Sequence, residues 1–145
     1  MLISSKGRYA LRLMVYMAQA SDGSDTVALR KVASSEGLSL KYLEQLARSM
    51  VGAGYLRSVR GREGGYTLAV DAASITAGDV LRAAEGQNAT VACAGLEDGC
   101  PRESICSTVS FWAGLDDVID EYVDGVTLAD LAGDDVNRRP YQTLG

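Results

Sequence analysis

Residues 29–52 contain two short helical patterns separated by only three residues, and this spacing constrains the fold more than any other feature. The first pattern places three apolar residues on one face: Leu29, Val32 and Ala33. After a turn at 36–38, Ser39 is a suitable N-cap for a second helix that stops near Gly52. That helix has apolar residues at helical spacing: Tyr42, Leu43, Leu46 and Met50. Two short helices joined by a tight glycine-containing turn predict a helix-turn-helix.

The next stretch, residues 55–70, alternates apolar and polar residues on both sides of a glycine-rich segment at 61–65. Its apolar positions are Leu56, Val59, Tyr66, Leu68 and Val70. This pattern predicts a β-hairpin with a flexible tip. Either half alone also occurs as a simple packing motif, but a hairpin directly after a helix-turn-helix, with shared positive charge, favours a winged helix.

Helical patterns surround this unit. Residues 6–20 predict a partly buried helix with a basic first turn. Thr76 with Asp79, and later Thr127 with Asp130, have the spacing of capping boxes that begin short helices. We therefore predict a mostly α fold with a small β-hairpin wing: a winged helix-turn-helix plus a long dimerisation helix.

The long helix is predicted at 109–123 and closed by Gly125, with acidic residues on its other face. Its apolar stripe includes Val109, Trp112, Leu115, Ile119 and Tyr122. Such a stripe needs a partner, and we expect the same helix of a second subunit to supply it in a two-fold dimer. Packing within the chain is the alternative.

The charge is divided unequally along the chain. Residues 1–70 carry ten Lys/Arg against five Asp/Glu, whereas residues 71–145 carry four against fourteen. The net charge of -5 therefore conceals a basic half suited to a polyanion, although solvated surface charge is the plainer interpretation.

On DNA, the second helix of a helix-turn-helix enters the major groove by its N-terminal residues. Gln45 could pair with adenine, and Glu44 could accept from cytosine or simply stabilise the first turn. Arg60 and Arg62 on the wing suit an A·T-rich minor groove. The predicted DNA-binding residues are Lys6, Arg8, Arg30, Ser39, Lys41, Tyr42, Glu44, Gln45, Arg60 and Arg62.

All three cysteines lie within fourteen residues, at Cys93, Cys100 and Cys106, and the chain has no histidine. No apolar stretch is long enough to cross a membrane and no signal peptide is evident, so we expect a soluble, cytoplasmic protein whose cysteines bind metal or sense redox state. Pro101 could start a helix that brings Cys106 back toward the others. Three thiolates can hold an iron-sulfur cluster or zinc; a reversible disulfide, or no ligand at all, are the alternatives.

The chain resembles the Rrf-type winged-helix regulators, a group with IscR-, NsrR- and CymR-like members. The resemblance covers residues 1 to about 132 and rests on ISSKGRYAL, LSLKYLEQL, RGREGGYTL, ITAGDVLRAAEG, the cysteine loop and TLADL. It implies a homodimeric bacterial transcription factor with a cluster in the loop that alters DNA affinity. Because a two-fold dimer would present two recognition helices, we expect it to bind a pseudo-palindromic operator in double-stranded DNA. It further implies that Tyr42, Glu44 and Gln45 face bases and that Arg60 enters the minor groove.

The expected organisation has four parts. Residues 1–86 form the winged-helix DNA-binding domain and 87–107 the cluster-binding loop. Residues 108–133 form the dimerisation helix with a C-terminal helix, and 134–145 a tail.

The loop departs from the family pattern. Its first cysteine gap is one residue longer than usual, Val109 stands where IscR-like members have a ligand histidine, and Arg8 stands where NsrR-like members have an aspartate. The cluster type, [2Fe-2S] or [4Fe-4S], and the fourth ligand stay open. Oxygen donors in the loop that could serve are Glu97, Asp98, Glu103, Ser107 and Thr108, and a cross-subunit group or an exogenous thiol or water are the other choices.

Two other functions compete with this interpretation. A cluster-free, CymR-like regulator of cysteine metabolism would act through a protein partner or a thiol switch. An enzyme is disfavoured, because the chain lacks histidine, a recognisable nucleophile-base pair and a phosphate-cradling loop followed by a helix.

Overall fold

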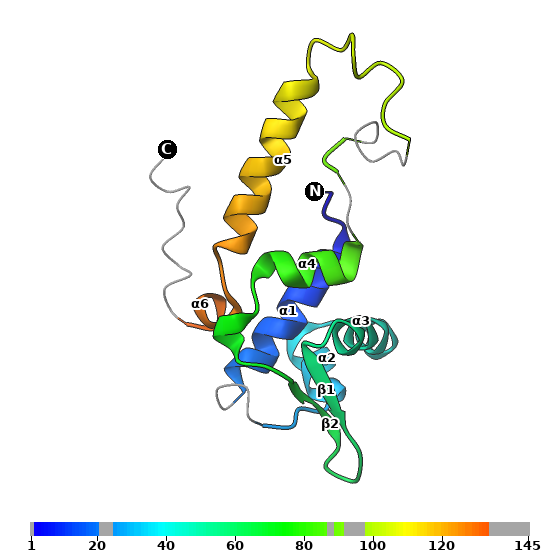
Figure 1. Ribbon diagram of the computed structural model, residues 1–145. Helices are drawn as coiled ribbons and strands as arrows, with labels where there is room; N and C mark the ends of the chain where they lie inside the picture. Colours follow the sequence, from blue (N-terminus) through cyan, green and yellow to red (C-terminus); the bar gives the residue numbers. More distant parts are fainter. Residues whose placement is uncertain (1, 21–24, 87–88, 92–97, 134–145) are drawn as a thin grey trace.

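The computed structural model describes residues 2–20, 25–86, 89–91 and 98–133. Six helices and one hairpin follow one another along these residues (Figure 1). The elements are α1 (Ser5–Gln19), α2 (Leu29–Glu36), α3 (Leu40–Gly52), β1 (Leu56–Val59), β2 (Gly65–Leu68), the short 3-10 helix η2 (Ala72–Ser74), α4 (Ala77–Glu85), α5 (Val109–Asp124) and α6 (Leu128–Ala132). The predicted fold class, mostly α with a two-stranded wing, is confirmed.

The helix-turn-helix forms for the local reasons that its sequence suggested. Gly37 ends α2 in the left-handed region at φ 66°, which a glycine adopts without the steric cost of a Cβ. Two residues later, the Ser39 side chain accepts a hydrogen bond from the Tyr42 backbone N–H and caps α3. The two helices are thereby set at a fixed angle by a turn of three residues.

The wing is attached to the rest of the unit through its second strand. Strands β1 and β2 pair antiparallel, with Leu56 opposite Leu68 and Val59 opposite Gly65. The backbones of Val27 and Tyr66 exchange two hydrogen bonds, at 2.8 and 2.9 Å, just before α2 begins. Gly65 has no side chain at the point where the Val27 carbonyl lies closest, so the approach is possible. The wing is therefore held beside the helix-turn-helix by backbone pairing.

The core surrounds α1, which packs against α3, α4 and α6. Its fully buried side chains include Leu13, Met14, Leu43, Met50 and Ile75. Leu128 of α6 is also fully buried, although it lies beyond the long helix in the sequence. The chain returns to the winged helix there through backbone hydrogen bonds from Ala77 to Val126 and from Leu128 to Ile75. Helix α6 is thus part of the same core as residues 5–85.

Helix α5 leaves this core and extends away from it (Figure 1). Of its residues only Val123, near its C-terminal end, is buried. Phe111 and Val118 are 61% and 63% exposed, and Tyr122 is 44% exposed. Within the described residues, no helix has the length and apolar character needed to cross a membrane.

Candidate nucleic-acid interface and cysteine pocket

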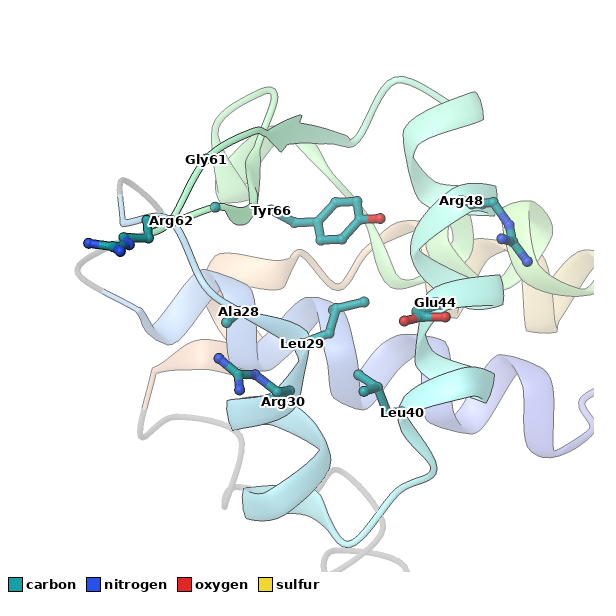
Figure 2. A pocket seen from close by; sticks show the side chains of 10 residues that line it. Ala28, Leu29, Arg30, Leu40, Glu44, Arg48, Gly61, Arg62 and Tyr66 are labelled. Carbon is teal, nitrogen blue, oxygen red and sulfur yellow. The ribbon is translucent and has the colours of Figure 1, made fainter.

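A groove of about 510 Å³ separates α2 and α3 from the wing (Figure 2). Arg30 of α2, Glu44 and Arg48 of α3, and Arg62 of the wing are among the residues that line it. The lining residues include three arginines and one glutamate, so the groove has an excess of positive charge. A cleft of this sign suits a polyanion, because low-dielectric walls focus the field inside it.

The residues predicted to bind DNA lie on the surface around this groove and on the adjoining ends of α1 and α3. All are exposed except Tyr42, which is half-buried. The Tyr42 ring packs edge-on against Tyr9 of α1, with ring centroids 5.8 Å apart. The side chain of Ser39 is engaged in its capping bond. Lys41, Glu44 and Gln45 are exposed on α3. Ser39 caps the start of this helix, and its inner face is buried in the core.

The wing tip presents Arg60 and Arg62 on a compact loop. The Gly64 backbone N–H donates to the Gly61 carbonyl at 3.0 Å, which closes the turn. A Cβ on Gly64 would lie 2.5 Å from the Val59 carbonyl oxygen, so the turn requires a glycine there. Both arginines are exposed on this compact loop, and Arg62 also lines the groove.

Arg48 lines the same groove as Glu44 but was not among the DNA-binding residues predicted from the sequence. The signal was present, because Arg48 follows Glu44 by four residues on α3 and so lies on the same face. The arginine can support the carboxylate of Glu44 or contact a phosphate directly.

Two sets of hydrogen bonds hold α1 against the end of α2 and the end of α4. Arg12 donates to the Glu36 carboxylate at 3.0 and 2.8 Å and to the Glu36 backbone carbonyl at 2.5 Å, at the end of α2. Glu85, the last residue of α4, accepts hydrogen bonds at the start of α1 from Ser4 and Gly7. Neither contact was anticipated, since each joins segments far apart in the sequence.

Cys100 and Cys106 line a second pocket, of about 360 Å³, between the cysteine loop and the first turns of α5. Its other donor groups are those of Glu103, Thr108 and Asp116, and its apolar wall includes Trp112. Both thiols are half-exposed and unpaired. The third predicted ligand, Cys93, and the candidate Glu97 lie outside the described residues. Within the described ranges, no three Cys, Asp or Glu side chains converge as a complete metal site.

Between Cys100 and Cys106 the chain forms turns, so the helix expected from Pro101 is wrong. The Glu103 N–H donates to the Cys100 carbonyl and the Ile105 N–H to the Arg102 carbonyl, both at 3.0 Å. These bonds span three residues and are not continued into a helical ladder. These turns nevertheless bring the Cys100 and Cys106 thiols to the same pocket.

The Cys106 thiol lies just ahead of α5, where hydrogen-bond donors favour its charged form. Its Sγ is 3.3 Å from the Thr108 hydroxyl. That hydroxyl, followed by the Thr108 backbone N–H, lowers the pKa of Cys106 below its ordinary value. A thiol with this bias is suited to coordinating a cation or to reacting with an oxidant.

Asp116 closes the far side of the pocket and was also missed from the sequence. Its carboxylate accepts from the Thr90 backbone N–H at 3.0 Å and from the Thr90 hydroxyl. Hydrogen bonding from Thr90 lowers the pKa of Asp116. The contact ties the segment before the loop to α5 and adds a carboxylate to the pocket.

Comparisons with known proteins point to one family. A family model described as "Rrf2: Iron-dependent Transcriptional regulator" matches residues 3–134. The HTH-type transcriptional regulator CymR of Bacillus subtilis is 38% identical over 132 residues, 91% of this chain and 90% of that protein. The HTH-type transcriptional regulator IscR of Vibrio campbellii is 37% identical over 134 residues, 92% of this chain and 79% of that protein.

Solved structures agree with the sequence comparisons. The structure titled as CymR, the global cysteine regulator of B. subtilis, superposes with a TM-score of 0.73 at 38% identity, covering 91% of this chain and 96% of that one. The structure titled "T. potens IscR" gives a TM-score of 0.72 at 35% identity, covering 90% of this chain and 85% of that one. Relatives with both names are about equally similar, so similarity alone does not choose between them.

Proposed function

The chain belongs to the Rrf2 family of transcriptional regulators, and from this premise we propose that it binds a pseudo-palindromic operator as a homodimer whose DNA affinity depends on a cysteine-held iron-sulfur cluster. The relatives are named as regulators, a non-enzymatic role. One observation carries the cluster proposal: Cys100 and Cys106 open onto a single pocket against α5.

DNA contact is assigned to the basic groove and its rims. The N-terminal turn of α3 enters the major groove, where Glu44 and Gln45 meet base edges, while Lys41 contacts phosphate. The wing places Arg60 and Arg62 at the adjoining minor groove. The exposure of these side chains and the capped start of α3 support this arrangement.

Dimerisation is assigned to α5. A helix of 16 residues with one buried side chain leaves much apolar surface facing water in the isolated chain. Since Trp112, Leu115 and Ile119 follow one another at helical spacing, the same helix of a second subunit could cover them. Two winged helices related by a two-fold axis would then meet half-sites about one helical turn apart or slightly more.

The side chains that line the pocket include residue types that can bind an iron-sulfur cluster. Cys93, Cys100 and Cys106 would be the thiolate ligands, and Glu103, Thr108 or Asp116 could supply an oxygen ligand from the pocket wall. When bound, the cluster would supply a redox-active centre that is sensitive to oxygen or nitric oxide. The lowered pKa of Cys106 favours the thiolate that such coordination requires.

A route from the pocket to DNA follows from the packing. The pocket wall is the first half of α5, and α5 contacts the winged helix through α4. Binding of a cluster by the loop would shift α5 relative to α4, and in a dimer this would change the separation of the two recognition helices. DNA affinity would change because both half-sites must be met together.

A second candidate is a cluster-free regulator that responds through its thiols or through a protein partner. It is favoured by the departures of the loop from the family pattern and by the similarity to CymR. Cys106, half-exposed and with a lowered pKa, would then be the group that reacts. In that case the purified protein would be colourless and would keep its DNA affinity in the presence of chelators.

The test combines reconstitution with DNA selection. Protein reconstituted without oxygen with iron and sulfide should contain both elements in stoichiometric amounts and absorb in the visible range, whereas Cys100→Ala should not. Ser104→Ala, a control in the same loop that does not line the pocket, should retain most of the cluster. Selection from random duplexes should enrich a palindrome. Bound zinc without sulfide, or a full cluster in the Cys100 variant, would contradict the cluster assignment; the absence of an enriched sequence would contradict DNA recognition.

A further inference from the structure

Glu85 caps the first turn of α1 from outside the helix. Its Oε1 accepts from the Ser4 backbone N–H at 2.6 Å, from the Ser4 hydroxyl at 2.7 Å and from the Gly7 backbone N–H at 2.8 Å. Its Oε2 lies 2.9 Å from the same hydroxyl. The first N–H groups of a helix have no partner within the helix, so a carboxylate at this position satisfies donors that would otherwise need water.

The contact is close. A Cβ on Gly7 would lie 2.8 Å from Oε1 of Glu85 and 3.0 Å from Cδ2 of Leu81, so any other residue at this position would require these two side chains to shift. Burial alone raises the pKa of Glu85, but hydrogen bonds from Ser4 and Gly7 outweigh it and leave the pKa below its ordinary value. The carboxylate is thus held in its charged form by α1.

The turn that Glu85 caps carries two cations and lies beside the recognition helix. Lys6 and Arg8 are the immediate neighbours of Gly7, and both are exposed. One residue further, Tyr9 packs edge-on against Tyr42 in the first turn of α3. The start of α1 therefore lies between the end of α4 and the DNA-facing end of α3.

We propose that Glu85 is a positioning residue for DNA binding: by capping α1 at Ser4 and Gly7, it fixes Lys6 and Arg8 where they meet the DNA phosphates. The inference rests on the proposed function, because it takes Lys6 and Arg8 as phosphate contacts. Glu85 touches no DNA itself and acts through the backbone of α1.

The proposal and the net charge alone predict opposite changes in DNA affinity when Glu85 is removed. Removing an acidic side chain from a DNA-binding protein should tighten binding, since the net attraction for phosphate increases. If Glu85 positions Lys6 and Arg8, its removal should instead weaken binding. Glutamine keeps a carbonyl oxygen that can accept from Gly7 or Ser4, so its effect should be intermediate.

The experiment measures the affinity of the full-length protein for its selected operator by fluorescence anisotropy at several salt concentrations. Glu85→Ala should bind about tenfold more weakly at ~0.1 M salt, and its salt slope should fall by about two, as expected when Lys6 and Arg8 both lose their phosphate contacts. Glu85→Gln should lie between this variant and the wild type. Glu121→Ala, which removes the same charge from the exposed side of α5, should bind as tightly as the wild type or slightly more tightly.

A double-mutant cycle with Lys6→Ala tests whether Glu85 acts on DNA binding through Lys6. Lys6→Ala should cost much less affinity in the Glu85→Ala background than in the wild type, whereas a merely structural Glu85 would give additive losses. If Glu85→Ala does not fold, as judged by thermal unfolding, Ser4→Ala replaces it in the cycle. It leaves the backbone donors of Ser4 and Gly7 in place and removes the Ser4 hydroxyl, which donates to Glu85 and accepts from the Lys6 backbone N–H.

The outcomes separate the inference from the proposed function. Wild-type protein that binds no duplex in a salt-dependent manner contradicts both. Wild-type binding together with unchanged or tighter binding by Glu85→Ala, or with an additive cycle, overturns the role of Glu85 alone.

Discussion

Arg82 of α4 donates two parallel hydrogen bonds to Asp124 at the C-terminal end of α5, at 2.8 Å from Nη1 and 2.7 Å from Nη2. Asp120, one turn earlier, lies 3.7 Å from the same guanidinium. Gly78 leaves room for the Asp124 carboxylate beside α4. This forked pair joins the long helix to the winged helix, so it fixes the direction in which α5 leaves the core.

The Arg82–Asp124 pair should make stability depend on pH. Hydrogen bonds from Arg82 lower the pKa of Asp124 below its ordinary value of 3.8. The pair therefore stabilises the fold fully above pH ~4, and this contribution is lost as the pH falls through the lower folded-state pKa. Asp124→Asn should reduce the free energy of unfolding by about 0.5–1 kcal/mol at neutral pH.

Urea unfolding of the wild type and of Asp124→Asn, at pH 7 and at pH 3, provides the measurement. The difference between them should shrink at the lower pH. A difference that is equal at both pH values would show that the pair contributes no charge-dependent stability.

Gly37→Ala should destabilise the helix-turn-helix. The residue is at φ 66°, where a Cβ is disfavoured, although open space surrounds it. The expected loss is about 1 kcal/mol in the free energy of unfolding. Gly52→Ala is the matched control, since Gly52 lies within α3 in equally open space. There alanine should be neutral or stabilising by up to about 1 kcal/mol. Equal effects at the two sites would contradict the left-handed turn.

Arg60→Ala should weaken operator binding most where the minor groove is A·T-rich, because arginine is drawn to narrow minor grooves. Operators that differ only in the A·T content of that segment provide the comparison. Arg102→Ala removes the same charge from the cysteine loop and should leave binding nearly unchanged. If Arg60→Ala binds every operator as the wild type does, the wing does not reach the minor groove.

Ile119→Glu should convert the dimer to monomers, because it puts a charge in the middle of the apolar stripe of α5. Sedimentation velocity at micromolar concentration measures the change. Asp117→Asn, on the acidic face of the same helix, should remain dimeric. A dimeric Ile119 variant would place the subunit interface elsewhere.

The features that the sequence predicted correctly are turns and helix caps, which are formed by residues close together in the chain. Gly37, Ser39 and the two threonine capping boxes each occur at the turn or helix start that the sequence predicts, and the capping bonds of Thr76 and Thr127 are present. These features depend on residues three or four positions apart, which is the range over which sequence patterns are informative.

Contacts between distant segments escaped prediction. Glu85 with Gly7, Arg12 with Glu36, and Thr90 with Asp116 join residues between 24 and 78 positions apart, and no spacing rule connects such pairs. The helix expected from Pro101 does not form, for a local reason. Ile105 is the one large apolar residue between Pro101 and Cys106, and it is exposed, so no apolar face is available to pack a helix there. The apolar stripe of α5 was also recognisable in the sequence, and in the structure Val123 is the only buried residue of this helix. Its pairing with a second subunit stays a prediction.

One titration can decide whether the cysteine loop controls DNA affinity. The selected operator is titrated anaerobically with iron- and sulfide-reconstituted protein, and again with the same preparation after its iron has been removed by a chelator. We expect the two dissociation constants to differ by about fivefold or more, as for a coupled site, and we expect no such difference for Cys100→Ala. Equal affinities before and after iron removal, in protein shown to have contained the cluster, would contradict this expectation.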